Sequence, residues 1–263
     1  MIVRQRFELM LQIARREIYS RYRGSWVGMA WVVLNPILML AIYTFVFAVV
    51  FRARWPNVGH GESTAIEFAV IVFVGLVVHG FFAECLVKAP MQILGHPNYV
   101  KKSVFPLHLL AGAQLIAALV HLLPTLCVLL IFQFWAFGLP PPTVLLLPLI
   151  LIPLGLLALG TMWIVSALTV YFRDVMQIVS LLVTAMLFLA PVLYPVEFVP
   201  AELQPLMYIN PLTFAIETLR GLALWGEWPS LSAYGLYCLY ALAVSMGGFA
   251  VFQWLRDGFS DVL

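Results

Sequence analysis

The sequence predicts an all-α polytopic membrane protein with six transmembrane helices, an N-terminal amphipathic interface helix and re-entrant helices before the last span. Of its 263 residues, 63% are hydrophobic and only 10% are charged. These are too few polar side chains to cover a soluble globule. Long apolar runs also alternate with short polar or proline-rich intervals. We therefore interpret residues 1–263 as one transmembrane domain, and the net charge of +2 is too small to suggest nucleic acid as a partner.

Residues 1–25 predict an amphipathic helix and not a signal peptide, because charged residues interrupt every apolar stretch. Apolar residues recur at spacings of three and four, namely Val3, Phe7, Met10, Leu11, Ala14, Ile18 and Tyr22. The other faces carry arginines, among them Arg15, Arg16, Arg21 and Arg23. This pattern is typical of a helix in the interface of an anionic leaflet. A solvated helix with an ordinary apolar face is the alternative.

Six apolar segments are expected to cross a membrane, because each is close to or longer than the roughly 20 residues that a spanning helix needs. They are, in chain order, about Trp26 to Phe51, Phe68 to Val87, Leu107 to Trp135, Val144 to Val170, Gln177 to Leu193 and Leu231 to Leu255.

The intervals between these segments predict loops of different kinds. Arg52 to Glu67 contains proline and glycine and is expected to be external, whereas residues 88–106 form a basic loop on the opposite side. Residues 195–228 are apolar in part but contain Asn210-Pro211, Glu217 and Arg220, so we expect short re-entrant or surface helices there. Glu217 and Arg220 are three residues apart and are expected to pair.

The distribution of the 14 Lys and Arg residues predicts the orientation. With both termini cytoplasmic, only Arg52, Arg54 and Arg220 lie outside. The cytoplasmic side then carries Arg4, Arg6, Arg15, Arg16, Arg21, Arg23, Lys88, Lys101, Lys102, Arg173 and Arg256. If Leu206 to Leu224 were a true span, the C-terminus would lie on the outside.

The search for catalytic chemistry is negative. The sequence contains no phosphate-binding loop of the G-x-x-x-x-G-K-[ST] type, and no H-E-x-x-H, C-x-x-C or G-x-S-x-G motif. Cys85, Cys127 and Cys238 are far apart and fit small buried hydrophobes. We expect no catalytic residue, no metal site and no cofactor bound by this chain.

Glu84 is the one acidic residue that suggests ion coupling, because it lies near the inner end of the second predicted span. Pairing with a basic neighbour is the simpler reading, and hydrogen-bonded packing is the simpler reading for His79 and His121. An ion-coupled secondary transporter would need more such groups and inverted repeats, and neither is visible in the sequence.

Aromatic residues make up 14% of the chain. Tryptophans at span ends, such as Trp55 and Trp228, are expected to be interfacial anchors. Tyr43, Phe47 and Phe51 recur at every fourth residue and share one helix face. This aromatic stripe fits helix packing, or else a conduit wall that offers sugars an apolar surface able to form hydrogen bonds.

Four stretches carry a resemblance to a known family. They are Arg21-Tyr22-Arg23-Gly24-Ser25-Trp26-Val27-Gly28 followed by Trp31 to Pro36, Asn98-Tyr99-Val100-Lys101-Lys102-Ser103-Val104-Phe105-Pro106, Tyr171-Phe172-Arg173-Asp174-Val175, and Asn210-Pro211-Leu212-Thr213. With these, the chain resembles the transmembrane subunit of a bacterial ABC-2 type exporter of the polysaccharide branch, which exports O-antigen, capsule and teichoic acid. A drug or small-lipid exporter of the same superfamily is the nearest alternative.

The resemblance implies partners and sites. A homodimer of this subunit would form a conduit in the bacterial inner membrane, and two copies of a separate ABC ATPase would hold ATP and Mg. Coupling to the ATPase would fall on the loop that contains Gly95, His96, Pro97, Asn98 and Tyr99.

The cargo implied by the resemblance is a polysaccharide linked to polyprenyl diphosphate. Its diphosphate would suit the arginines of the interface helix, Arg15, Arg16, Arg21 and Arg23. Four further charged residues are expected to anchor the cytoplasmic ends of the helices, namely Lys101, Lys102, Arg173 and Asp174. The stripe Tyr43, Phe47 and Phe51 would line the conduit.

Overall fold

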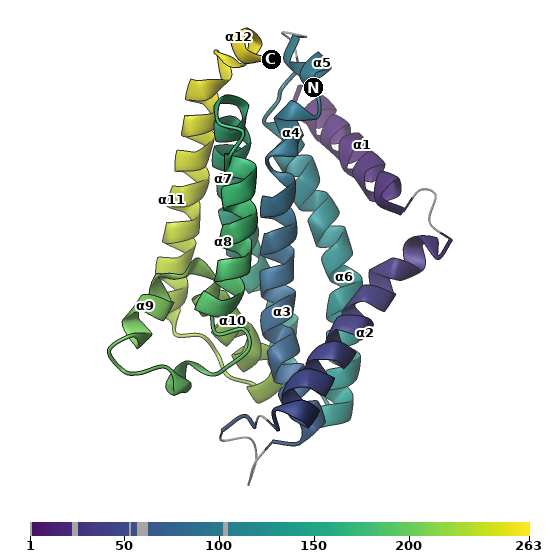
Figure 1. Cartoon of the computed structure of the whole chain (residues 1–263), viewed down its shortest axis with the longest axis vertical. Coiled ribbons are helices and arrows are strands. Elements are labelled where there is room, and N and C mark those ends of the chain that lie inside the picture. The colour runs from purple at the N-terminus through teal and green to yellow at the C-terminus, as the bar shows by residue number, and fades with distance from the viewer. Residues whose placement is uncertain (1, 23–25, 53, 57–62, 102–104) are drawn as a thin grey trace.

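A computed structural model describes residues 2–22, 26–52, 54–56, 63–101 and 105–263, and every regular element among them is helical. The long helices stand side by side as one bundle, and α1 and α2 lie along one flank (Figure 1). This confirms the predicted all-α class.

Four helices in the described part of the chain are long and apolar enough to cross a membrane. They are α3 (Ala65–Lys88), α6 (Leu109–Phe137), α7 (Leu147–Tyr171) with the 3-10 turn before it, and α11 (Leu231–Arg256). They coincide with the second, third, fourth and last predicted spans. The helix α2 (Trp31–Tyr43) and the helix α8 (Val175–Leu189) are apolar but shorter.

The backbone explains why α2 and α8 are shorter than predicted. The α-helix starts at Trp31 and not at Trp26, because Gly28 has a left-handed φ of 55° and a 3-10 turn, Gly28–Ala30, follows it. At its far end α2 continues as a π-helical turn, Thr44–Val50. The helix α8 stops at Leu189, because Ala190 precedes a proline and is extended.

Successive long helices run in opposite directions, so the connections alternate between the two ends of the bundle (Figure 1). One end holds the start of α1 (Ile2–Tyr22), the short helices α4 (Met91–Leu94) and α5 (Pro97–Lys101), the turn between α7 and α8, and α12 (Phe259–Val262). The opposite end holds α9 (Gln204–Ile209) and α10 (Pro211–Arg220). The chain termini therefore share one end, as the charge pattern predicts.

The helix α3 is the centre of the core and packs against α6, α7, α8 and α10. Its side chains are buried on nearly every face from Phe68 to Val78. The helix begins with a capping box, in which the Thr64 hydroxyl accepts from the Glu67 amide and the Glu67 carboxylate accepts from the Thr64 amide.

The helices α7 and α11 form the closest crossing. A Cβ atom added at Gly160 would lie 2.6 Å from the Cα of Ser245, and one added at Gly248 would overlap the carbonyl of Gly160. Glycines at both positions let the two backbones touch, as small residues do in membrane helix pairs.

Residues 206–224 are broken into short helices. The sequence is compatible with either short helices or a true span there. Asn210 ends α9 and caps α10, because its side-chain oxygen accepts from the Leu212 amide and Pro211 occupies the first helical position. The helix α10 is 10 residues long, about half of what a spanning helix needs. A π-helical turn, Gly221–Trp225, ends at the left-handed Gly226.

Candidate functional site

The predicted aromatic stripe forms in the structure. The rings of Tyr43 and Phe47 stack with centroids 6.1 Å apart, and those of Phe47 and Phe51 lie 5.7 Å apart. Phe47 also contacts Phe68 of α3, at 6.4 Å between centroids. The middle ring therefore packs against the bundle, while Phe51 is exposed.

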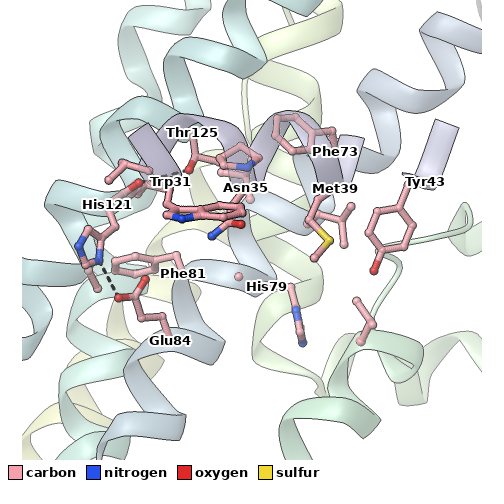
Figure 2. A pocket seen from close by; sticks show the side chains of 18 residues that line it. Trp31, Asn35, Met39, Tyr43, Phe73, His79, Phe81, Glu84, His121 and Thr125 are labelled. Carbon is pink, nitrogen blue, oxygen red and sulfur yellow. Dashed lines mark hydrogen bonds and ion pairs between the residues drawn. The ribbon is translucent and has the colours of Figure 1, made fainter. Parts of the chain in front are cut away.

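Beside the stripe lies a cavity of about 340 Å³ between α2, α3 and α6, which we call the central cavity (Figure 2). Trp31, Asn35, Met39 and Tyr43 line it from α2. Tyr43 stands at the end of the cavity farthest from Glu84 and His121 (Figure 2). The stripe and the cavity thus share one residue, Tyr43.

Glu84 and His121 form the polar end of the central cavity. His121 Nδ1 lies 2.7 Å from Glu84 Oε1, and the Lys88 ammonium lies 3.8 Å from the same oxygen. The His79 Nε2 atom lies 2.9 Å from the Val183 carbonyl. The structure confirms the simpler readings, since Glu84 has basic neighbours and His79 is a hydrogen-bonded packing residue.

The predicted coupling residues follow α4, with Gly95 and His96 between α4 and α5 and the other three in α5. The rings of His96 and Tyr99 are stacked 5.3 Å apart, and Tyr99 stacks in turn on Phe105 at 4.3 Å. Gly95, Pro97 and Asn98 are exposed at the end of the bundle.

Arg16 of α1 contacts this region. Its Nη2 atom lies 3.4 Å from His96 Nε2, and its Nη1 atom donates to the Tyr99 hydroxyl at 3.5 Å. The other face of α1 packs on α6, where Ala14 is buried and Met10 reaches Gly112. Residues assigned from sequence to two separate sites are therefore in contact.

A second cavity, of about 530 Å³, opens beside Arg16, between α1, α3, α4 and α6. We call it the basic cavity, because Arg16 and Lys88 line it. Val87 and Met91 form part of an apolar wall. The sequence did not predict this cavity, because Arg16 and Lys88 come from helices that are far apart in the chain.

The remaining predicted charged residues are spread over one end of the bundle. Arg15 is exposed and lies over the Tyr19 ring at 5.6 Å. Arg173 and Asp174 are exposed in the turn between α7 and α8. The side chains of Arg21, Arg23, Lys101 and Lys102 lie outside the described residues.

Arg220 forms a buried network at the opposite end. Its Nη1 donates to Glu217 at 2.7 Å, its Nε to the Ile71 carbonyl at 3.2 Å and its Nη2 to the Val192 carbonyl at 2.9 Å. The pairing with Glu217 confirms the prediction.

The prediction that Trp55 is an interfacial anchor is wrong. Its indole is 5% exposed and lies under the Arg220 guanidinium at 4.5 Å, so it is a core residue and not an interfacial anchor. A buried cation favours an aromatic face, and local sequence patterns do not reveal this contact because 165 positions in the chain separate Trp55 from Arg220. Trp228, in contrast, is 73% exposed.

Comparisons with known proteins support one family. Residues 8–224 match the family model described as ABC-2 type transporter. Two relatives from Klebsiella pneumoniae, each named O-antigen export system permease protein RfbA, are 28% and 27% identical over 261 residues, which is 98% of this chain and 95% of each relative. A relative of the same name from Myxococcus xanthus is 27% identical over 96% of this chain and 94% of its own length.

The family match covers most of the chain, and the helices that can cross a membrane fall largely within it. The chain therefore belongs to the ABC-2 type transporter family of multi-pass membrane proteins.

Proposed function

We propose that this chain is the permease subunit of an ATP-driven exporter that moves a lipid-linked polysaccharide, most closely of the O-antigen type, across the bacterial inner membrane. The observation that carries this proposal is the similarity to named O-antigen export permeases over nearly the whole of both chains. A drug or small-lipid exporter of the same family is the second candidate. The long similarity to the O-antigen permeases favours the first.

In this proposal two copies of the chain form the conduit, and two copies of a separate ABC ATPase bind ATP and Mg. The match to the ABC-2 type transporter family and the similarity to relatives named as permease proteins support a separate ATPase. We assign contact with that ATPase to residues 88–106, within which Gly95, His96, Pro97, Asn98 and Tyr99 would meet it. The exposure of Gly95, Pro97 and Asn98 at one end of the bundle supports this assignment.

The proposed topology has six spans, with α2 and α8 as the first and fifth, and both termini in the cytoplasm. The shared end of the termini and the excess of Lys and Arg at that end support it. Residues 1–25 would lie in the interface, and Lys101, Lys102, Arg173 and Asp174 would anchor helices there. Residues 195–228 would re-enter the membrane from the outside, which their short helices and buried polar contacts favour.

The proposed mechanism transmits ATPase closure through the coupling loop to α2, α3 and α8. These helices would shift the equilibrium between a narrow and an open conduit at the homodimer interface. The conduit wall would include Tyr43, Phe47 and Phe51. The diphosphate of the cargo would first meet the arginines near the N-terminus, Arg15, Arg16, Arg21 and Arg23.

A genetic experiment separates the two candidate functions. In the native bacterium, deletion of this gene should leave the lipid-linked polysaccharide exposed only on the cytoplasmic side, and the intact gene should restore it to the surface. Surface glycan is measured with an antibody or lectin on whole cells. Unchanged surface glycan together with increased sensitivity to a hydrophobic drug would favour the second candidate.

A further inference from the structure

The basic cavity combines positive charge with an apolar wall. Arg16 and Lys88 supply cations, whereas Ile13, Val87, Met91 and Leu110 supply apolar surface. Glu17 also lines it, but its carboxylate accepts from the Ser20 hydroxyl at 3.3 Å. A wall of this kind suits an amphiphile with an anionic head and an alkyl tail.

Gln114 gives an independent indication of a ligand. It lines the basic cavity and is 2% exposed, yet its Nε2 atom has no hydrogen-bond partner among the described residues. A buried amide that donates no hydrogen bond costs about 1–3 kcal/mol. An acceptor oxygen in the cavity would satisfy this donor.

The hydrogen bonds of His96 orient the cation beside it. Its Nδ1 lies 3.2 Å from the Gln92 carbonyl, which can only accept, so Nδ1 carries the proton. Nε2 then accepts from Arg16. The Arg16 guanidinium keeps further N–H groups for a ligand, since it has five donors in all.

We propose that the basic cavity binds the phosphate of an anionic amphiphile, with Arg16 and Lys88 as ionic partners and Gln114 as a hydrogen-bond donor. The alkyl part would lie along Val87 and Met91, which are 50% and 52% exposed. Phosphate oxygens accept several N–H bonds at once and pair well with arginine. A phospholipid headgroup and the diphosphate of a lipid-linked cargo share this chemistry.

The position of the cavity gives the ligand a role in coupling. Arg16 contacts both His96 and Tyr99, so a phosphate held by Arg16 ties α1 to the loop between α4 and α5. Two parts of this proposal rest on the proposed export function: the role of the ligand in coupling, and the lipid-linked cargo as a source of the ligand. Binding itself is measured without ATP, ATPase or transport, so its failure is distinguishable from failure of that function.

The test is direct binding to the purified permease in nanodiscs of neutral phosphatidylcholine, measured by calorimetry. The probes are farnesyl diphosphate, dihexanoyl phosphatidylglycerol and, as a neutral reference, dihexanoyl phosphatidylcholine. Binding of either anionic probe, with no binding of the neutral one, supports the site and identifies its source. Absence of binding by both anionic probes would overturn it.

Substitutions of two buried glutamines test whether the probe binds in the basic cavity. Gln114→Leu removes one hydrogen bond to a charged group and should raise Kd about tenfold. Gln133→Leu is the matched control, because Gln133 is 1% exposed on the same helix, has no partner for its amide among the described residues and does not line the cavity. Equal Kd values for these two variants would contradict the proposal.

Charge variants test the site if Gln114→Leu does not fold. Arg16→Gln and Lys88→Gln should each weaken binding at least tenfold, since each removes an ionic partner. Arg4→Gln is the control, because Arg4 is exposed and pairs with Glu8 at 2.9 Å. A loss of affinity in Arg4→Gln as large as in Arg16→Gln would overturn the site, because attraction would then depend only on overall charge.

Discussion

The Arg220 guanidinium lies 4.5 Å from the centre of the Trp55 ring and is fully buried. It reaches that position past Gly75, where an added Cβ would lie 3.1 Å from Nη2 and 2.9 Å from the Val192 Cα. Arg220 therefore ties α10 to the middle helix α3 and to the segment after α8, at the end of the bundle opposite the termini.

Glu217→Gln should destabilise the protein, because it removes the only carboxylate that pairs with Arg220 in the described structure. Loss of one partner of a buried ion pair costs about 3–5 kcal/mol of folding free energy. For Glu217→Gln we expect a cost near the lower end of this range, because the Glu217 side chain is 36% exposed. Thermal unfolding of the detergent-purified protein measures the change. Glu202→Gln, at an exposed position, is the control. Equal melting temperatures for the two variants would show that the pair contributes nothing.

Trp55→Leu should also lower the melting temperature, whereas Trp228→Leu should not. The first removes a buried ring beside a cation, and the second removes an exposed ring. Truncation of a buried Phe or Trp to alanine costs about 3–5 kcal/mol, and leucine should cost less because it retains part of the side-chain volume. If Trp55 were an interfacial anchor, the two variants would behave alike in detergent.

Gly248→Val should disrupt the crossing of α7 and α11, and the neighbouring Gly247→Val should be tolerated. A side chain at Gly248 would meet the backbone of Gly160, but nothing lies within 4 Å of a Cβ at Gly247. Both changes have the same helix propensity, so their difference reports packing alone. We expect Gly248→Val to lower Tm by about 5 °C or more. Similar Tm values would show that the helices can move apart at little cost.

Asn98→Asp and Gly95→Leu should reduce export per ATP hydrolysed while leaving membrane insertion intact. Asn98 is exposed, and a Cβ at Gly95 would lie 2.7 Å from the Met91 carbonyl, so the second change reshapes α4. Asn98→Ala is the neutral control for the first. The ratio of glycan exported to ATP hydrolysed is measured in proteoliposomes. An unchanged ratio would remove this loop from the mechanism.

Tyr43→Ala and Phe47→Ala should slow polymer passage more than they reduce assembly with the ATPase. Phe47→Ala should in addition lower Tm, because Phe47 packs on Phe68, whereas Tyr43 lines the central cavity. Phe45→Ala, an exposed ring in the same turn, is the control. Normal export by both stripe variants would leave the stripe with a packing role only.

The sequence predicts the helices well wherever a local signal determines them. Apolar runs locate α3, α6, α7 and α11, and the turn residues Asn210-Pro211 predict the break between α9 and α10. The aromatic stripe follows from spacing alone, since residues four apart share a helix face. The pairing of Glu217 with Arg220 follows for the same reason.

Contacts between distant segments could not be predicted from one sequence. The Arg16 contacts with His96 and Tyr99, the His121 contact with Glu84 and the burial of Trp55 each depend on how helices pack. The apolar composition of residues 190–193 also predicts a fifth span that ends later than α8 does. The helix stops at Leu189 because Ala190 precedes a proline, which disfavours a helical conformation at Ala190.

The most direct test of the proposed function is reconstitution of the permease with its ATPase in sealed proteoliposomes that contain a short glycan on undecaprenyl diphosphate. The fraction of glycan that a membrane-impermeant glycosidase can reach is followed with and without ATP. We predict that ATP moves the glycan across the membrane and that an ATPase unable to hydrolyse ATP does not. Glycan movement that is the same in the presence and absence of ATP, or that does not require this chain, would contradict the account.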